Sequence, residues 1–494
     1  MDSNQLARAM RWSIADGALA TVMGTLTSGV FITGLALALG ASELQIGILA
    51  ALPPLATVMQ LAGSYLIERY GKRKRLCLLA SLASRLIWLP MIATLVLPVE
   101  PGHAVWIIAG LIAVGSCFNS IVGVAWLSWT KELVPDHLRI GFLSQRNFVT
   151  TLLALTLGMF VGLFLDSWNV AHPGSMSGFA VLLMLALVAG LGSSYCMSNV
   201  DDPLPSGESV RAPQFPKLLT LPLRDLNFRR VVLFYVAWNL SVNLAGPFFC
   251  VYMLQTLDLP FWQVTALLTL SSVSGLAANG FWARMKQRFG IKPVIFLATL
   301  ADACVPLLWL FVAAGAHWLL VVIHLFGMFS SPLALGPNNL VLRLSPSTGG
   351  SAYMAVFSAL AGPVIAIASM CGGAICGAFG VAEWSIGPWA LDGLEVLFLL
   401  SFIGRSLSLL VLRRITEPEA SRAKDAFAHI CRSLAGAITR KSDRLGEHPH
   451  ITIVRLRTRP RYELAQSGSR EARARNGSHA IHTTHESLSS ERAG

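Results

Sequence analysis

The chain has 494 residues, of which 54% are hydrophobic and 13% are charged, and its mean hydropathy is +0.61. Ordinary soluble domains carry about a quarter charged residues. The 26 acidic and 38 basic side chains are therefore too few to cover the water-facing surface of a soluble chain of this length. A water-soluble protein is excluded, and most of the apolar surface must face lipid.

Apolar runs of about 20 residues recur along most of the chain, and each is long enough to cross a hydrocarbon layer of about 30 Å as a helix. None shows the period-two alternation of a barrel strand. Helices also satisfy their own backbone polar groups in lipid. The sequence predicts an all-α polytopic membrane protein with twelve transmembrane helices, at about 13–39, 45–67, 76–97, 104–129, 147–166, 177–198, 229–254, 262–283, 293–314, 317–337, 352–380 and 388–412.

Basic side chains lie on alternate loops only. The loops between them, near Glu43, Glu100, Asp166, Asp258 and Glu383, carry no Lys or Arg. Positive charge collects on the cytoplasmic side of membrane proteins, so we expect an integral protein of the cytoplasmic membrane with both termini in the cytoplasm. This arrangement and contact with anionic lipid explain the net charge of +12. Nucleic acid is not expected as a partner.

A polar segment that contains several prolines divides the helices six and six. It predicts an N-terminal six-helix half at 1–198, a cytoplasmic linker at 199–228 and a C-terminal six-helix half at 229–413. The remainder, 414–494, is predicted to be a basic, mostly disordered cytoplasmic tail that could begin with an amphipathic helix over 417–441. A shift of 219 residues lays Arg69-Tyr70-Gly71 on Arg288-Phe289-Gly290, which favours two pseudo-repeats.

A short motif follows the second predicted helix, where residues 63–75 read GSYLIERYGKRKR. It resembles the loop 2–3 signature of the major facilitator superfamily (MFS), G-x-x-x-D-R-x-G-R-R/K, with Glu68 in place of the Asp. A second copy follows the eighth helix but has Gln287 at the acidic position, and the loop after the fourth helix resembles another superfamily pattern. The residues that carry the resemblance are Glu68, Arg69, Gly71, Lys72, Arg73, Arg139, Arg288 and Gly290.

The resemblance implies the MFS fold and a gating role for these eight residues. Contacts between such a motif and the opposite half exist when the cytoplasmic side is closed and break when it opens, so they shift the balance between two states. By the resemblance, Glu68 would meet the start of the eleventh helix near Ser351.

The resemblance also implies that helices 1, 4, 7 and 10 line a central cavity. Polar side chains on these helices could bind a solute, although each could instead form an interhelical hydrogen bond. Because they are amides and hydroxyls with little fixed charge, they favour a neutral or weakly charged polar solute. The candidate cavity residues are Thr21, Thr25, Ser28, Asn119, Asn239, Asn243, His324 and Asn338.

Ionisable side chains at membrane depth are costly and often functional. Asp16 and His324 are candidates for proton coupling, because a coupling group must be a carboxylate or a His exposed to each side in turn. Asp16 could alternatively form an interfacial salt bridge with Arg8 or Arg11. Arg85 and Asp302 are expected to be buried charges with a structural role. No metal site is expected, since the histidines of the tail lack a complete ligand set.

The sequence therefore predicts a secondary active transporter that moves a small organic solute by alternating access and is coupled to protons. Two alternatives stay open. One is a multidrug or solute exporter of the drug–proton antiporter type, although the segment around Gly362-Pro363 lacks the antiporter spacing. The other is a membrane scaffold or sensor that acts through its tail without transport. An enzyme and a cofactor are not expected; the expected partners are a small-molecule substrate and membrane lipids, and the expected state is a monomer.

Overall fold

The computed structural model describes residues 3–200, 222–313, 315–345, 350–380, 384–386, 389–418 and 420–433. The chain divides into two units, Met1–Ser433 and Leu434–Gly494. Most of the predicted linker and the tail from residue 434 onward lie outside the described residues.

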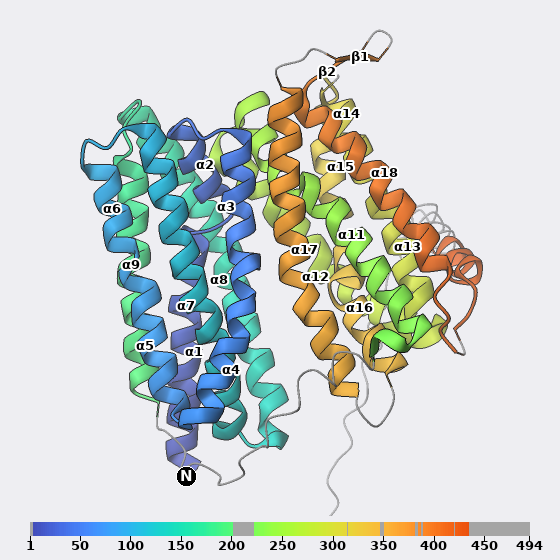
Figure 1. Ribbon diagram of the computed structural model, residues 1–494, viewed down its shortest axis with the longest axis horizontal. Helices are drawn as coiled ribbons and strands as arrows, with labels where there is room; N and C mark the ends of the chain where they lie inside the picture. Colours follow the sequence, from blue (N-terminus) through green and yellow to red (C-terminus); the bar gives the residue numbers. More distant parts are fainter. Residues whose placement is uncertain are drawn as a thin grey trace, which may run out of the picture. The chain divides into compact units, whose positions relative to one another are not determined.

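The first half of the chain folds into apolar helices whose backbone hydrogen bonds are satisfied within each segment, as lipid requires. Gly29, with φ +58°, breaks the first span between α1 and α2, and Pro53 and Pro54 precede a turn of 3-10 helix in the second. The helices are α1 Ser3–Leu26, α2 Val30–Ala38, α3 Glu43–Leu55, η1 Ala56–Val58, α4 Met59–Tyr70, α5 Arg73–Leu86, α6 Trp88–Val96, α7 Pro101–Leu133, α8 Asp136–Ala171 and α9 Ser177–Ser198 (Figure 1).

The second half repeats this pattern and adds one short hairpin. Strands β1 Trp384–Ile386 and β2 Trp389–Leu391 pair antiparallel ahead of the last helix. The helical elements are η2 Pro222–Arg224, α11 Leu226–Val251, the π-helical turn η3 Tyr252–Thr256, α12 Phe261–Phe289, α13 Ile291–Ala303, α14 Val305–Ala313, α15 Leu319–Leu325, η4 Phe326–Phe329, α16 Ser330–Leu344, α17 Gly350–Phe379 and α18 Gly393–Arg413.

Among the described residues, twelve helical segments are long and apolar enough to cross a membrane. The prediction of an all-α fold with twelve transmembrane helices is confirmed, and the hairpin β1–β2 is a small addition to it. Several helices are longer than predicted, because they continue past the apolar run into polar ends. For example, α7 has 33 residues and α8 has 36.

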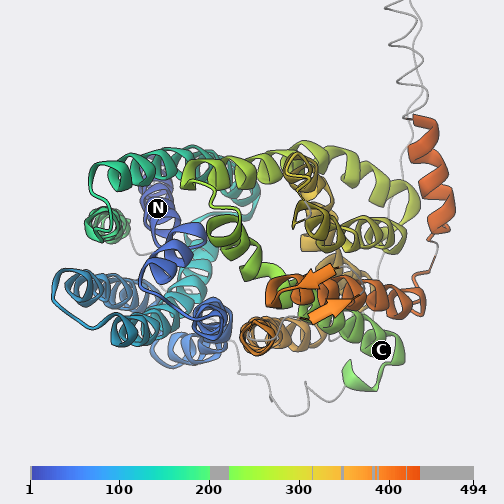
Figure 2. The ribbon, with the colours of Figure 1, turned by 90° about the horizontal axis from the view of Figure 1, so that it is seen from above.

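The ends of the helices define two faces, which we call the basic face and the opposite face. The basic face carries Arg69–Arg75, Arg139 and Lys292, and the opposite face carries Glu43 and Asp166. Near the opposite face, α3 lies beside α17, and α8 lies beside α12 (Figures 1 and 2).

Small residues let α3 and α17 approach closely. A Cβ atom added at Gly47 would lie 2.5 Å from the backbone oxygen of Ser369, and one added at Gly373 would lie 2.6 Å from the backbone oxygen of Glu43. Larger side chains at these positions would separate the helices, and small residues are the usual means of close helix packing in membranes.

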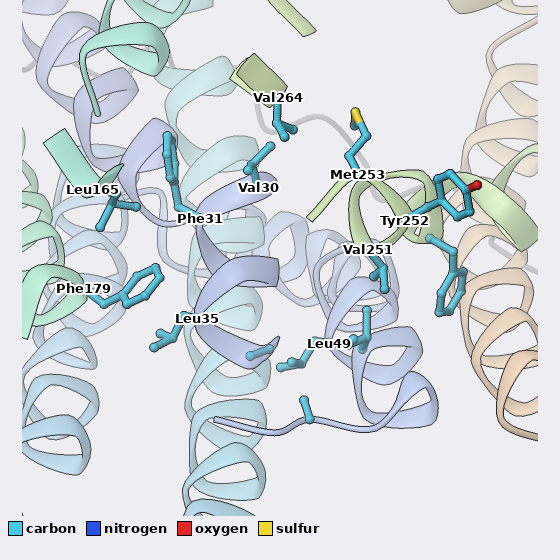
Figure 3. Packing of buried hydrophobic residues seen from close by; sticks show 14 of the residues in the cluster. Val30, Phe31, Leu35, Leu49, Leu165, Phe179, Val251, Tyr252, Met253 and Val264 are labelled. Atoms are coloured by element: carbon cyan, nitrogen blue, oxygen red, sulfur yellow. The ribbon is translucent and has the colours of Figure 1, made fainter. Parts of the chain in front are cut away.

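A shared apolar core fills the space between the halves near the opposite face (Figure 3). Phe31 and Leu35 of α2 lie in it together with Val251, Tyr252 and Met253 of the second half. All five side chains are at most 5% exposed. This core and the α3–α17 contact together close the opposite face.

We expect Gly47→Val to destabilise the protein by about 1–3 kcal/mol, because the added methyl groups would overpack the contact between α3 and α17. The measurement is the unfolding temperature of the detergent-solubilised protein. Gly110→Val is the matched control, because a Cβ atom at Gly110 meets nothing within 4 Å. An unfolding temperature that falls equally in both variants, or in neither, would contradict the role of Gly47.

Candidate transport site

Asp166, at the end of α8, joins the two halves at the opposite face. Its carboxylate accepts hydrogen bonds from the backbone N–H groups of Phe261, at 2.9 Å, and Trp262, at 2.8 Å. These N–H groups begin α12, where a negative charge is favoured by the helix dipole and by the unsatisfied donors. The phenyl ring of Phe261 also lies 6.4 Å from that of Phe31, centroid to centroid. The opposite face is thus closed by polar as well as apolar contacts.

In the part of the chain that the structure describes, the predicted gating residues of the first half bond within that half. The Arg73 guanidinium lies 2.6 Å from the Glu132 carboxylate and donates to Ser128 Oγ at 2.9 Å. Arg69 donates to the hydroxyl of Tyr65 on its own helix. Gly71 ends α4 with φ +64°, the left-handed conformation that the turn into α5 needs.

Glu68 and Lys72 form no hydrogen bond or ion pair with any described residue. The side chain of Ser351 lies outside the described residues, so the contact expected between Glu68 and the start of α17 stays a prediction. Arg139 pairs with Asp136 and donates to the backbone oxygens of Lys131 and Val134, all around the turn between α7 and α8.

The second copy of the motif bonds to the segment that follows α18. Gly290 has φ +95°, and the Glu417 carboxylate accepts from the backbone N–H groups of Ile291, at 3.1 Å, and Lys292, at 2.7 Å. Glu417 also pairs with Arg343 at 2.8 Å, and its side chain is 0% exposed. Glu417 thus caps α13, although sequence reasoning placed it at the start of an amphipathic helix. Arg288 lies over the neighbouring ring of Phe289.

The contacts named above leave the halves joined near the opposite face. At the basic face, the described side chains of the two motif copies bond within their own halves. Among the described residues, the contacts named here between the halves thus lie toward the opposite face.

A cavity of about 580 Å³ lies between the halves. Of the predicted cavity residues, Thr21 lines it. Sequence reasoning missed the polar side chains of α8 and α12, because the expected lining was limited to helices 1, 4, 7 and 10. Ser272 and Asn279 lie seven residues apart on α12, and this helical spacing could have identified them. The polar lining residues are Thr21, Thr150, Thr151, Ser272, Asn279, Ser330 and Ser331.

A second cavity, of about 520 Å³, lies within the first half between α1, α3, α5 and α7. The predicted residues Ser28 and Asn119 both line it. Trp88 lines it too, and its indole N–H is buried with no hydrogen-bond acceptor among the described residues. A buried donor without a partner is unfavourable, so a solute oxygen or nitrogen could satisfy it. The polar lining residues are Thr27, Ser28, Thr57, Gln60, Ser84, Ser116, Asn119 and Ser120.

The other predicted cavity residues lie elsewhere. Thr25 and Asn338 line neither cavity. Asn239 and Asn243 each donate to a backbone oxygen one turn back on α11. His324 is buried, and its ring shares a hydrogen bond of 2.7 Å with the Leu320 oxygen and lies edge-on to Trp309.

Asp16 is the centre of a buried polar network in the first half. Ser193 of α9 donates to Asp16 Oδ1 at 2.6 Å, and Arg146 of α8 lies 3.6 Å from Oδ2. Arg85 donates to the same Ser193 hydroxyl at 2.8 Å. Asp16 is thus paired with Arg146 rather than with Arg8 or Arg11. The Arg146 guanidinium also lies 4.2 Å from the ring centroid of Trp126.

The second half has a corresponding but tighter pair. Arg405 of α18 donates to the Asp302 carboxylate of α13 at 2.8 Å and to the hydroxyl of Ser401. The Arg405 side chain is 4% exposed and the Asp302 side chain is 20% exposed. Arg85 and Asp302 are therefore each held by another helix of their own half. Among the described residues, no three His, Cys, Asp or Glu side chains gather as metal ligands would.

Twelve spanning helices, arranged as two halves around a polar cavity that is closed at one face, define a membrane transporter. A family model of the Major Facilitator Superfamily matches residues 17–265, and the chain belongs to this superfamily. A sequence search of curated proteins found no match.

Solved structures show the same fold. A mutant form of the nucleoside transporter NupG is 11% identical with a TM-score of 0.63, over 84% of this chain and 100% of that one. The inward-open xylose transporter XylE from E. coli is 15% identical with a TM-score of 0.56, over 86% of this chain and 98% of that one. The prediction of an MFS fold is confirmed.

We expect Asp166→Ala to favour opening of the opposite face. Loss of a charge-assisted cap of about 1–2 kcal/mol would change the ratio of the two conformations about 5–30-fold. Distances between spin labels at residues 39 and 258 would report this change in reconstituted protein. Glu100→Gln is the control, because Glu100 pairs only with His103 of the same half. Unchanged distances in Asp166→Ala would contradict the role of this carboxylate.

Proposed function

We propose that the chain is a secondary active transporter that moves a small, neutral, polar organic solute across the cytoplasmic membrane by alternating access. The observation that carries this proposal is the cavity of about 580 Å³ between two halves that are joined near one face. Such a cavity can be exposed to each side in turn if the halves rock about it.

The basic face is proposed to be cytoplasmic, because the positive-inside rule places Lys and Arg there. The conformation described is then the inward-open one. In the outward-open state, the gating motif would connect the halves at the basic face. Glu68 and Lys72, which have no described partner here, are available for this contact.

The lining of the two cavities supports a neutral solute. Their polar groups are hydroxyls and amides, and none of the described lining residues is ionisable. Trp88, Met91 and Leu111 add apolar surface to the inner cavity, so a solute with both a ring face and several hydroxyl or amide groups fits best. NupG and XylE, which share the fold, are named as transporters of nucleosides and xylose, and both solutes are of this kind.

Proton coupling is proposed to run through Asp16. Its separation of 3.6 Å from Arg146 is longer than that of the Asp302–Arg405 pair. Protonation of Asp16 would remove the charge that holds Arg146 beside α1, and so would couple proton binding to the contact between α1 and α8. His324 lies away from both cavities and receives no coupling role here.

We expect Asn119→Ala and Trp88→Phe each to raise the KM for the transported solute about 2–10-fold, because each removes one hydrogen-bonding group from the cavity. The measurement is uptake into proteoliposomes, screened first with nucleosides and pentoses and then with amino acids and amphipathic drugs. Asn199→Ala, at the end of α9, is the control outside both cavities. Transport of amphipathic cations alone, or transport in the outward direction alone, would favour the exporter. If no solute is transported, the proposal of a transporter is contradicted.

We expect Asp16→Asn to abolish accumulation driven by a proton gradient while solute exchange at equal pH continues, because Asn cannot carry the proton. The measurement compares both modes in the same proteoliposomes. Asp425→Asn, an exposed carboxylate outside the membrane-spanning helices, is the control. If Asp16→Asn accumulates solute like the unaltered protein, the coupling proposal is wrong, although the transport proposal is unaffected.

A further inference from the structure

A third cavity, of about 510 Å³, lies at the basic face where α13 begins and α18 ends. It is separate from the two cavities described above and shares no lining residue with them. Four cationic residues line it: Lys292, Arg413, Arg414 and Arg422. We propose that it binds the phosphate of an anionic phospholipid.

The charge of this cavity is strongly positive. Glu417 is its one described acidic lining residue, and its carboxylate is already occupied by Arg343 and by two backbone N–H groups. Arg414 and Arg422 are exposed, and the guanidinium groups of both form no hydrogen bond or ion pair with described residues. The guanidinium groups of Arg414 and Arg422 can each offer a planar pair of donors to phosphate oxygens.

The backbone around the cavity is held in place without a ligand. Lys292 donates to the backbone oxygens of Arg413 and Ile415, and Glu417 fixes the start of α13. The helical segment 423–433 also packs on the second half through Ala426, which is 0% exposed. The cations are therefore brought together by the fold, and binding would not have to order the backbone.

The position of the cavity indicates a lipid rather than a soluble anion. It lies where the spans Ile291–Val312 and Gly393–Arg413 end, at the level of lipid headgroups. Arg413 lies over the ring of Phe296, which lines the cavity.

Apolar surface continues from the cavity along the two packed helices. Leu300, one turn beyond Phe296, is 48% exposed, and Leu410, one turn before Arg413, is 52% exposed. Acyl chains could lie along this surface while the phosphate is held by the arginines.

The test uses the delipidated full-length chain in neutral detergent. Its unfolding temperature is measured against increasing dioleoylphosphatidylglycerol, dioleoylphosphatidylcholine or sn-glycerol 3-phosphate. We expect phosphatidylglycerol to stabilise the protein at lower concentration than either of the others. The double variant Arg414→Gln/Arg422→Gln should need about thirtyfold more phosphatidylglycerol, since each cation contributes about 1 kcal/mol.

The control variant Arg8→Gln/Arg75→Gln removes the same charge from exposed positions of the basic face in the other half. Equal losses in both double variants would overturn the proposal in favour of general surface attraction. Equal stabilisation by sn-glycerol 3-phosphate would assign the site to a soluble phosphate instead. If the double variant does not fold, the single variants Arg414→Gln and Arg422→Gln are compared in the same way.

Discussion

The structure depends on the close contact of small residues where the two halves meet near the opposite face. Gly47 and Gly373 let the backbones of α3 and α17 touch, and the core around Phe31 and Tyr252 fills the space beside them. In lipid there is little hydrophobic drive to bring helices together, so packing of this kind must supply the association energy. Close contact of this kind continues from the opposite face as far as Gly362 of α17, which approaches Pro54 and Thr57.

The two halves share a design but differ in how they hold charge. Each buries an Asp and an Arg from different helices, and in each a serine hydroxyl accepts a hydrogen bond from an arginine. Asp302 and Arg405 form a direct pair, whereas Asp16 is bonded mainly to a serine and lies farther from its arginine. A direct buried pair resists the loss of either charge. This difference supports the proposal that Asp16, rather than Asp302, carries the coupled proton.

The number and type of helices could be predicted from the sequence, because each apolar run predicts one spanning helix. The alternation of basic and non-basic loops supports the same number independently. The bonding partners could not. Arg146 meets Asp16 from 130 residues away, and no local pattern states which of several arginines turns inward. Likewise Ser272 and Asn279 reach a cavity from the eighth spanning helix, which the resemblance does not include among the lining helices. Which side chains line the cavity depends on how each helix is rotated about its own axis. Apolar composition alone does not determine that rotation.

The position of Glu417 changes where the folded protein can be considered to end. Hydropathy falls away after Arg414, yet this carboxylate three residues later is completely enclosed and serves as a cap for a helix that begins over 120 residues earlier. The second copy of the motif has Gln287 where the signature has an acidic residue. Glu417 supplies a carboxylate to this copy from a distant part of the chain. A reporter protein fused after Ser433 would leave this anchor intact, whereas one joined directly to the last membrane helix would remove it. An end of the folded protein placed from hydropathy alone would thus exclude part of the fold.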